Sequence, residues 1–176
     1  IFKGRLLFSE PKRGDVIVFK TPADHRTDYI KRVIGLPGDE IQFIDGDLYL
    51  NNNQILKTFL SSVDKIYCGN NIIKVNTFKE KLPNGKSYIA SYRQDHSFQN
   101  SDKFNIPENH YFFLGDNRDC SKDSRFLSEV GYVHKNNIVG KARILFFSSD
   151  YRIGSILKFW QWSQILRFNR FFKKIN

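Results

Sequence analysis

The sequence predicts a mainly β protein of coiled antiparallel sheets, with a small β insertion and an amphipathic helix at its C-terminus. Short runs of β-branched and aromatic residues alternate with turn signals through most of the chain. Among the 176 residues are 17 Phe and 8 Tyr, which are types enriched in strands. A hydrophobic content of 40% favours a folded domain over a disordered chain. Only after residue 150 does the pattern change to a helical period.

The predicted strand around Lys31 is the segment on which the functional argument depends. Tyr29–Ile34 is rich in β-branched and aromatic residues, and a Pro-Gly turn follows it. Alternation along a strand places Tyr29, Lys31 and Val33 on one face and Arg32 on the other. A lysine among apolar neighbours loses hydration of its charged form, so its pKa falls, as a general base near neutral pH requires. The alternative is an edge-strand lysine that protects against aggregation.

The other predicted strands follow from the same patterns. Asp45-Gly46, between alternating apolar residues, predicts a tight hairpin turn. The stretch 58–103 carries weaker signals, with two strands flanking a Pro-Asn-Gly turn, and we expect a small β insertion there. The predicted strands are Gly14–Phe19, the two arms of a hairpin over Asp39–Ile55, segments near Ile72–Val75 and Ser87–Ala90, Ile106–Leu114 and Ile138–Ser148.

The C-terminal segment carries most of the excess charge. Of the formal charge of +10, six positive charges lie in residues 151–176, which contain no acid. On a helical wheel over 155–174, large apolar residues gather on one half and basic residues lie mostly on the other. We therefore predict an amphipathic helix that lies on an anionic membrane surface. A helix docked on the protein's own sheet is the first alternative, and RNA or DNA binding, which we do not expect, is the second.

Cysteine and histidine are too few and too scattered to build a metal site. Cys68 and Cys120 cannot form one by themselves, and His96, His110 and His134 lack the spacing of metal ligands. We therefore expect no metal and no cofactor. We expect both cysteines to be free thiols, with a disulfide between them as the alternative.

Two motifs in the chain resemble those of a known enzyme family. Tyr29–Asp39 reads YIKRVIGLPGD, and Gly115–Arg125 reads GDNRDCSKDSR at the end of an apolar strand. In this order they resemble type I signal peptidase, a Ser/Lys protease of bacterial membranes. Pro11–Phe19 is similar to the strand that precedes the family's lysine. The resemblance covers about residues 11–57 and 104–149.

The resemblance implies roles for residues of both motifs. Lys31 matches the family's general base, and Ser121 matches the serine that hydrogen-bonds the lysine amine and orients it. A hydroxyl that only caps the turn is the alternative for Ser121. Our candidates for the apolar wall around the amine are Tyr29 and Phe19, with Phe113 or Leu114.

Other residues of the polar turn are expected to support this site. Gly115 and Asn117 both tolerate positive φ, and we expect them to serve the turn geometry in this way. The expected ion pairs are Asp123–Arg125, which matches a structural pair of the family, and Arg32–Asp116.

The implied function is that of a serine endopeptidase that removes signal peptides from exported preproteins after small-x-small motifs such as Ala-x-Ala. In this family the catalytic domain lies on the extracytoplasmic (periplasmic) face of the bacterial plasma membrane. The chain contains no methionine, no Ser-Met-x-Pro-like motif and no apolar run of about 18 residues. We therefore expect the nucleophilic serine, the oxyanion hole and the membrane anchor to precede Ile1, and this chain alone to be inactive.

The implied organisation is a catalytic β domain in two parts, 1–57 with the lysine strand and 104–149. The insertion 58–103 separates these parts, and the basic aromatic helix occupies 150–176. Two other functions stay open. One is a self-cleaving repressor-type Ser/Lys peptidase, and the other is a non-catalytic β module that binds membrane or nucleic acid.

Overall fold

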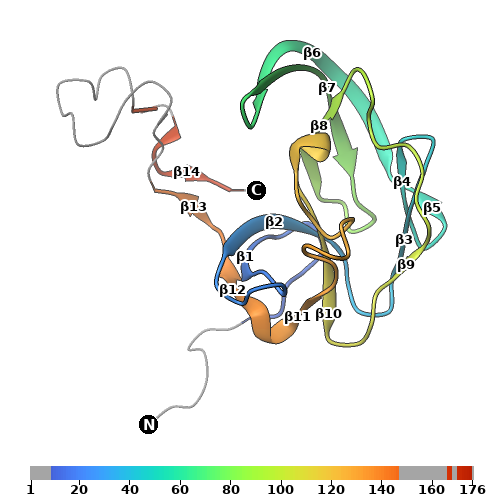
Figure 1. Ribbon diagram of the computed structural model, residues 1–176, viewed down its shortest axis with the longest axis vertical. Helices are drawn as coiled ribbons and strands as arrows, with labels where there is room; N and C mark the ends of the chain where they lie inside the picture. Colours follow the sequence, from blue (N-terminus) through green and yellow to red (C-terminus); the bar gives the residue numbers. More distant parts are fainter. Residues whose placement is uncertain (1–8, 147–165, 168–169, 176) are drawn as a thin grey trace. The chain divides into compact units, whose positions relative to one another are not determined.

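The computed structural model describes residues 9–146, 166–167 and 170–175 (Figure 1). The chain divides into two compact units, 1–141 and 142–176. The first unit consists of antiparallel sheets with two short 3-10 helices, η1 (Arg118–Cys120) and η2 (Lys135–Asn137). The predicted fold class, mainly β with antiparallel sheets, is therefore confirmed.

A five-stranded antiparallel sheet carries the lysine motif. Its strand order is β11–β10–β2–β1–β12, so the strand with Lys31 is an inner strand and not an edge strand. Pairing with β1 includes Lys31, opposite Ile17, whereas pairing with β10 ends at Arg32. The strands are β1 (Val16–Lys20), β2 (Asp28–Gly35), β10 (His110–Leu114), β11 (Val133–His134) and β12 (Ile138–Lys141).

Two apolar clusters are formed by residues that alternate along this sheet. Val33 of β2 and Phe113 of β10 belong to one cluster, while their chain neighbours Ile34 and Phe112 belong to the other. Successive side chains of a strand point to opposite faces, so the sheet has a core on each side. Lys31, two residues before Val33, lies on the face of the smaller cluster.

A second sheet contains the predicted hairpin. Its order is β5–β4–β3–β9, with Asp45 and Gly46 at the turn between β3 and β4. Both turn residues have positive φ, as the favoured two-residue hairpin turn requires, so this prediction is confirmed. The strands are β3 (Glu40–Ile44), β4 (Asp47–Leu50), β5 (Asn53–Gln54) and β9 (Phe104–Asn105).

A third sheet fills most of the predicted insertion. It comprises β6 (Leu56–Cys68), β7 (Asn71–Lys81) and β8 (Ser87–Arg93), in that order. Figure 1 shows β6 and β7 as a long curved hairpin, with β8 beside β7. Strand β6 could not be predicted from the sequence, because most of its residues are exposed and it has no alternation of buried and exposed positions. Its formation depends on pairing with β7 along nearly its whole length.

The C-terminal unit differs from the prediction where it is described. Most of the predicted helix over 155–174 lies outside the described residues, but Lys173–Lys174 forms strand β14, which pairs with β13 (Ile144–Leu145). Phe172 has a positive φ of 52°, a conformation that a right-handed helix excludes. The predicted strand Ile138–Ser148 is likewise two strands, β12 and β13, and its last two residues lie outside the described range. In the described part of the chain, no helix is long and apolar enough to cross a membrane.

Candidate active site

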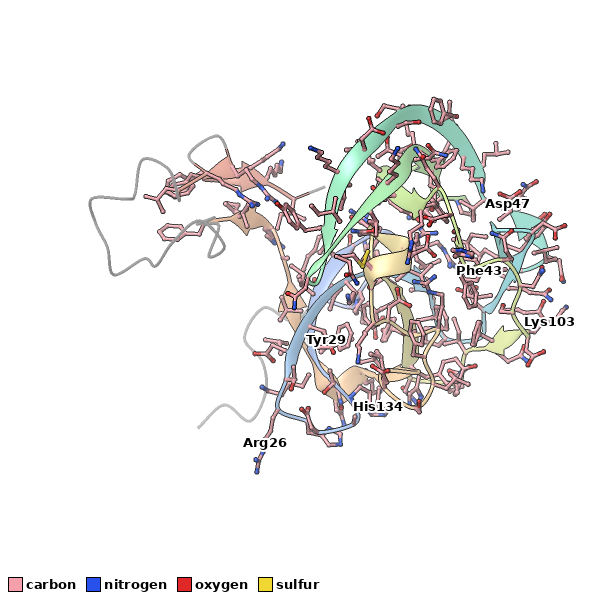
Figure 2. All side chains as sticks on the ribbon, turned by 45° about the horizontal axis from the view of Figure 1, so that its top comes forward. Arg26, Tyr29, Phe43, Asp47, Lys103 and His134 are labelled. Carbon is pink, nitrogen blue, oxygen red and sulfur yellow. A yellow bond between two sulfur atoms is a disulfide. The ribbon has the colours of Figure 1, made fainter. Side chains whose placement is uncertain are left out.

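Lys31 projects from β2 toward the turn that follows β10. Its Nζ donates a hydrogen bond of 2.6 Å to Ser121 Oγ. The same Nζ lies 5.4 Å from the centre of the Tyr29 ring, two residues away on the same face of β2. The side chain of Tyr29, labelled in Figure 2, is only partly buried. The structure therefore brings together three of the residues that the sequence analysis selected.

The aromatic surface on this face comes from three strands. Phe19 of β1 stacks on Phe113 of β10 with ring centres 4.5 Å apart, and its ring centre lies 6.2 Å from that of Tyr29. Of the two candidates on β10, Phe113 belongs to the cluster on the Lys31 face, whereas Leu114 belongs to the opposite cluster. Alternation along β10 is the reason for this difference.

The surroundings of Lys31 favour its neutral form. Burial removes water from the charged amine and lowers the pKa of Lys31 below its ordinary value. The carboxylates of Asp123 and Asp116 act against this shift, while the positive charge of Arg125 adds to it. Burial has the larger effect, so near neutral pH a larger fraction of this amine is neutral, and able to accept a proton, than for an exposed lysine.

Gly115 is needed for close approach and not for a positive φ. A Cβ at this position would lie 2.0 Å from Ser121 Oγ and 3.6 Å from Lys31 Nζ. Asn117 also has an ordinary φ of −90°, so the expectation of positive φ at both residues is wrong. The turn closes tightly because residue 115 has no side chain, and this allows Ser121 to reach the lysine.

The ion pair between Asp123 and Arg125 lies inside the turn, with both side chains almost fully buried. Arg125 Nε donates to Asp123 Oδ1 at 2.8 Å, and the other carboxylate oxygen accepts the Gly115 N–H at 3.0 Å. Arg125 also donates to the carbonyl oxygen of Arg118. This pair therefore joins both ends of the turn to each other.

A second ion pair lies between Arg32 and Asp116. Two parallel hydrogen bonds of 2.8 Å connect Arg32 Nε and Nη2 to the two oxygens of Asp116. Arg32 Nη1 also donates to the carbonyl oxygen of Gly14, and its guanidinium lies 4.4 Å from the centre of the Tyr88 ring. The pair connects the beginning of the turn to the lysine strand.

Four residues of a buried network were not assigned a role from the sequence. Arg118 of η1, which is completely buried, donates to Glu80 at 2.6 Å and to the hydroxyls of Tyr88 and Tyr92. Burial by itself raises the pKa of Glu80, but Arg118 and the two tyrosine hydroxyls outweigh it and lower the pKa. No local sequence pattern indicates the pair between Glu80 and Arg118, because the two residues are 38 positions apart in the chain.

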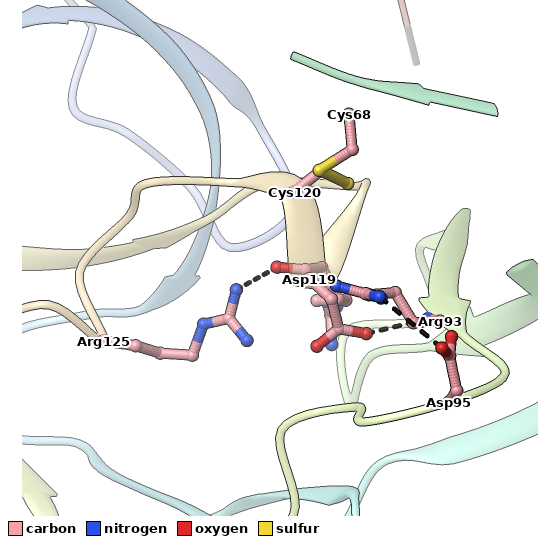
Figure 3. The surroundings of a disulfide bond; sticks show 7 residues. Cys68, Arg93, Asp95, Asp119, Cys120 and Arg125 are labelled. Atoms are coloured by element: carbon pink, nitrogen blue, oxygen red, sulfur yellow. Dashed lines mark hydrogen bonds and ion pairs between the residues drawn. A yellow bond between two sulfur atoms is a disulfide. The ribbon is translucent and has the colours of Figure 1, made fainter. Parts of the chain in front are cut away.

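The cysteines form a disulfide, so the expectation of free thiols is wrong. Cys68, the last residue of β6, is joined to Cys120, the last residue of η1, with their Cα atoms 5.4 Å apart (Figure 3). Beside it, Asp119 Oδ2 accepts the backbone N–H of Arg93 at 2.8 Å. The register of the missed strand β6 brings the two cysteines together across 52 residues, and this could not be inferred without that strand.

No cluster of metal-ligating side chains occurs among the described residues. His110 and His134 face each other across β10 and β11, with ring centres 5.0 Å apart.

Comparisons with known proteins identify the family of the chain. A family model described as signal peptidase, peptidase S26, matches residues 3–147. The signal peptidases I of Rickettsia typhi and Rickettsia prowazekii are each 42% identical to the chain over an alignment 191 positions long. This alignment covers 99% of this chain and 70% of each relative. A crystal structure of a signal peptidase I from Enterococcus faecalis aligns with 76% of this chain and 97% of that chain, at 26% identity and a TM-score of 0.43.

A half-buried lysine whose pKa is lowered by burial has the character of the general base that a Ser/Lys peptidase requires. The chain belongs to the signal peptidase family, peptidase S26. The resemblance seen in its motifs is thereby confirmed.

Proposed function

We propose that this chain carries the general base of a signal peptidase I, which removes signal peptides from exported preproteins after small-x-small motifs. The contact between Lys31 Nζ and Ser121 Oγ, at 2.6 Å, is the observation that carries the proposal. It places a partly dehydrated amine, with a lowered pKa, against a hydroxyl that orients it. This arrangement has no evident purpose in a module that only binds.

In this proposal the nucleophile is a serine that precedes Ile1. Neutral Lys31 takes the proton of that serine while its oxygen attacks the scissile carbonyl. The protonated amine then returns the proton to the leaving amine, which separates from the new acyl-enzyme. Water, deprotonated by the same lysine, then attacks the acyl carbonyl, and the lysine returns this proton to the serine oxygen as the bond between that oxygen and the acyl group breaks.

Ser121 and the two ion pairs would support this chemistry without touching the reacting bond. Ser121 accepts the hydrogen bond that orients the amine of Lys31. The ion pair Asp123–Arg125 joins two parts of the turn to each other. The ion pair Arg32–Asp116 joins the turn to β2. We therefore assign Tyr29 to the wall of the site and these four charged residues to its support.

We propose that the domain acts on the extracytoplasmic face of a bacterial plasma membrane. The Cys68–Cys120 disulfide supports this location, because disulfides persist in oxidising compartments. The basic segment 155–174 would lie on the anionic membrane surface, a proposal that rests on its sequence alone. Exported preproteins are the proposed partners, without nucleic acid and without a cofactor.

The test of function compares this chain with a longer version that includes a serine-bearing segment before Ile1. Both are incubated with a preprotein and with an Ala-x-Ala peptide. We expect only the longer version to cut after the small-x-small motif, and Lys31→Ala to reduce its rate by about 10²–10⁴-fold. Lys74→Ala, at a largely exposed lysine, is the matched control and should leave the rate unchanged. Specific cleavage by the short chain, abolished in Lys31→Ala, would contradict the assignment of the nucleophile.

The membrane proposal has a separate test with the whole chain. Flotation with anionic vesicles and with neutral vesicles should show binding only to the anionic ones, and Lys173→Glu with Lys174→Glu should weaken it. Binding to oligonucleotides but not to anionic vesicles would instead support the nucleic-acid alternative.

A further inference from the structure

The Cys68–Cys120 disulfide joins the tip of a long hairpin to the turn that carries Ser121. Cys68 ends β6 just before the turn into β7, and Cys120 is the residue immediately before Ser121. The covalent bond is therefore one residue away from the hydroxyl that contacts Lys31 Nζ. Figure 2 shows this bond in yellow beside η1.

The rest of the turn is attached to two other strands of the insertion, β7 and β8. Arg118 of η1 pairs with Glu80 of β7 at 2.6 Å. Ser91 of β8 donates its backbone N–H to the backbone carbonyl oxygen of Asp116 at 2.8 Å, and Asp119 Oδ2 accepts the backbone N–H of Arg93, also at 2.8 Å. These contacts lie at the beginning of the turn and at η1. The disulfide is the attachment to the insertion that lies nearest to Ser121 along the chain.

The position of Ser121 tolerates little movement. Ser121 Oγ occupies the space where a Cβ of residue 115 would lie, and its bond to Lys31 Nζ is 2.6 Å long. A displacement of about 1 Å would lengthen this bond beyond the usual range for a hydrogen bond. It would also open a path for water to the amine, whose burial is the main cause of its altered basicity.

We propose that the Cys68–Cys120 disulfide positions Ser121 against Lys31, so that the full activity of the site requires the oxidised protein. Both cysteines are positioning residues, since neither touches the reacting atoms. A dithiol such as dithiothreitol reverses the effect: it gives two electrons and two protons to the disulfide, forming two thiols and a cyclic disulfide.

Loss of the bond has a defined consequence for Lys31. Water that reaches Nζ restores hydration of the charged form, so the pKa rises toward the ordinary value of 10.5. Each unit of this rise lowers the fraction of neutral amine at neutral pH about tenfold. The effect on Lys31 stands by itself, and only the effect on catalysis rests on the proposed function.

The experiment measures the titration of Lys31 by carbon-13 NMR of its Cε in the whole chain. Oxidised protein is compared with protein reduced by dithiothreitol and with Cys68→Ser, which leaves the neighbour of Ser121 unchanged. We expect a higher Lys31 pKa in both proteins that lack the disulfide, the reduced protein and Cys68→Ser. Adding dithiothreitol to Cys68→Ser should cause no further change.

Thr77→Val is the matched control, because it removes the hydrogen bonds between Thr77 and Ser61 in the same hairpin and keeps the disulfide. It should leave the titration of Lys31 unchanged. An unchanged titration in folded Cys68→Ser would overturn the proposal. Unfolding of both the reduced protein and Cys68→Ser, judged by circular dichroism, would also overturn the proposal, because the disulfide would then contribute to stability only.

Cleavage assays on the longer, serine-bearing version separate this proposal from the proposed function. In Cys68→Ser we expect a lower kcat with little change in KM, and an acidic limb of the pH–rate profile that moves to higher pH. A shifted Lys31 titration with no cleavage by any version would refute the proposed function alone. Cleavage with an unshifted titration would refute the role of the disulfide alone.

Discussion

Ser121 reaches Lys31 because the residue packed against it has no side chain. At Gly115 the backbone adopts an ordinary φ, so the turn needs glycine there for close approach and not for the positive φ that the sequence predicted. The actual constraint is the 2.0 Å separation between an added Cβ and Ser121 Oγ. Such a contact joins positions six residues apart within a turn, and it becomes visible only when the turn is folded.

Gly115→Ala should destabilise the protein, because Ser121 must move to make room for the methyl group. The expected loss is about 1–3 kcal/mol in the free energy of unfolding, measured by urea denaturation. Gly140→Ala is the matched control, since no atom lies within 4 Å of its added Cβ. That control should change stability by less than about 0.5 kcal/mol.

Lys31→Met should stabilise the protein at low and neutral pH, because folding then no longer removes water from a charged amine. The pKa of Lys31 is lowered in the folded state, so the unfolded chain binds the extra proton between the folded pKa and 10.5. The stability gain of the variant is therefore largest below the folded pKa, and it shrinks as pH rises toward 10.5. Denaturation from pH 6 to about pH 10.5 measures it, with Lys74→Met as the control for loss of a charge. A gain that grows with pH would contradict the assigned direction.

At the scale of elements, the insertion is attached to the active-site turn through a buried ion pair. Glu80 of β7 and Arg118 of η1 each expose only 1% of their side chains. The sequence predicted strands in this region but not their lengths or partners, because exposed strands such as β6 have no buried face to mark them. Pairing between strands decided those lengths.

Glu80→Gln should cost about 3–5 kcal/mol in the free energy of unfolding, because it leaves the charge of Arg118 buried without a counter-ion. Asp64→Asn removes the acidic member of an exposed pair with Lys74 on the same sheet. That control should cost less than about 1 kcal/mol. Equal effects of the two variants in urea denaturation would show that the buried pair contributes no more than a surface pair.

At the scale of the whole molecule, one covalent bond closes a loop from β6 to η1. Cys68 and Cys120 are 52 residues apart, and a loop of this size restricts the unfolded chain strongly. The loop encloses most of the insertion and its connection to β10. The bond is therefore expected to stabilise the first unit as well as to position Ser121.

Reduction of the disulfide should lower the free energy of unfolding by about 4 kcal/mol, the value that loop closure predicts for this separation. Denaturation with and without dithiothreitol measures the loss. The double variant Cys68→Ser with Cys120→Ser should unfold like the reduced protein and should not respond to dithiothreitol. A response of the double variant would show that the reductant acts elsewhere.

The β-rich class, the hairpin at Asp45-Gly46, the family, and the candidates Lys31 and Ser121 could all be predicted from the order of the residues. These follow from local preferences and from motifs that are contiguous in the chain. The close approach at Gly115, the disulfide and the burial of Arg118 could be recognised only in the folded protein. Each of these depends on contacts set by how the turn and the strands pack, and short-range patterns in a sequence do not encode which surfaces will meet.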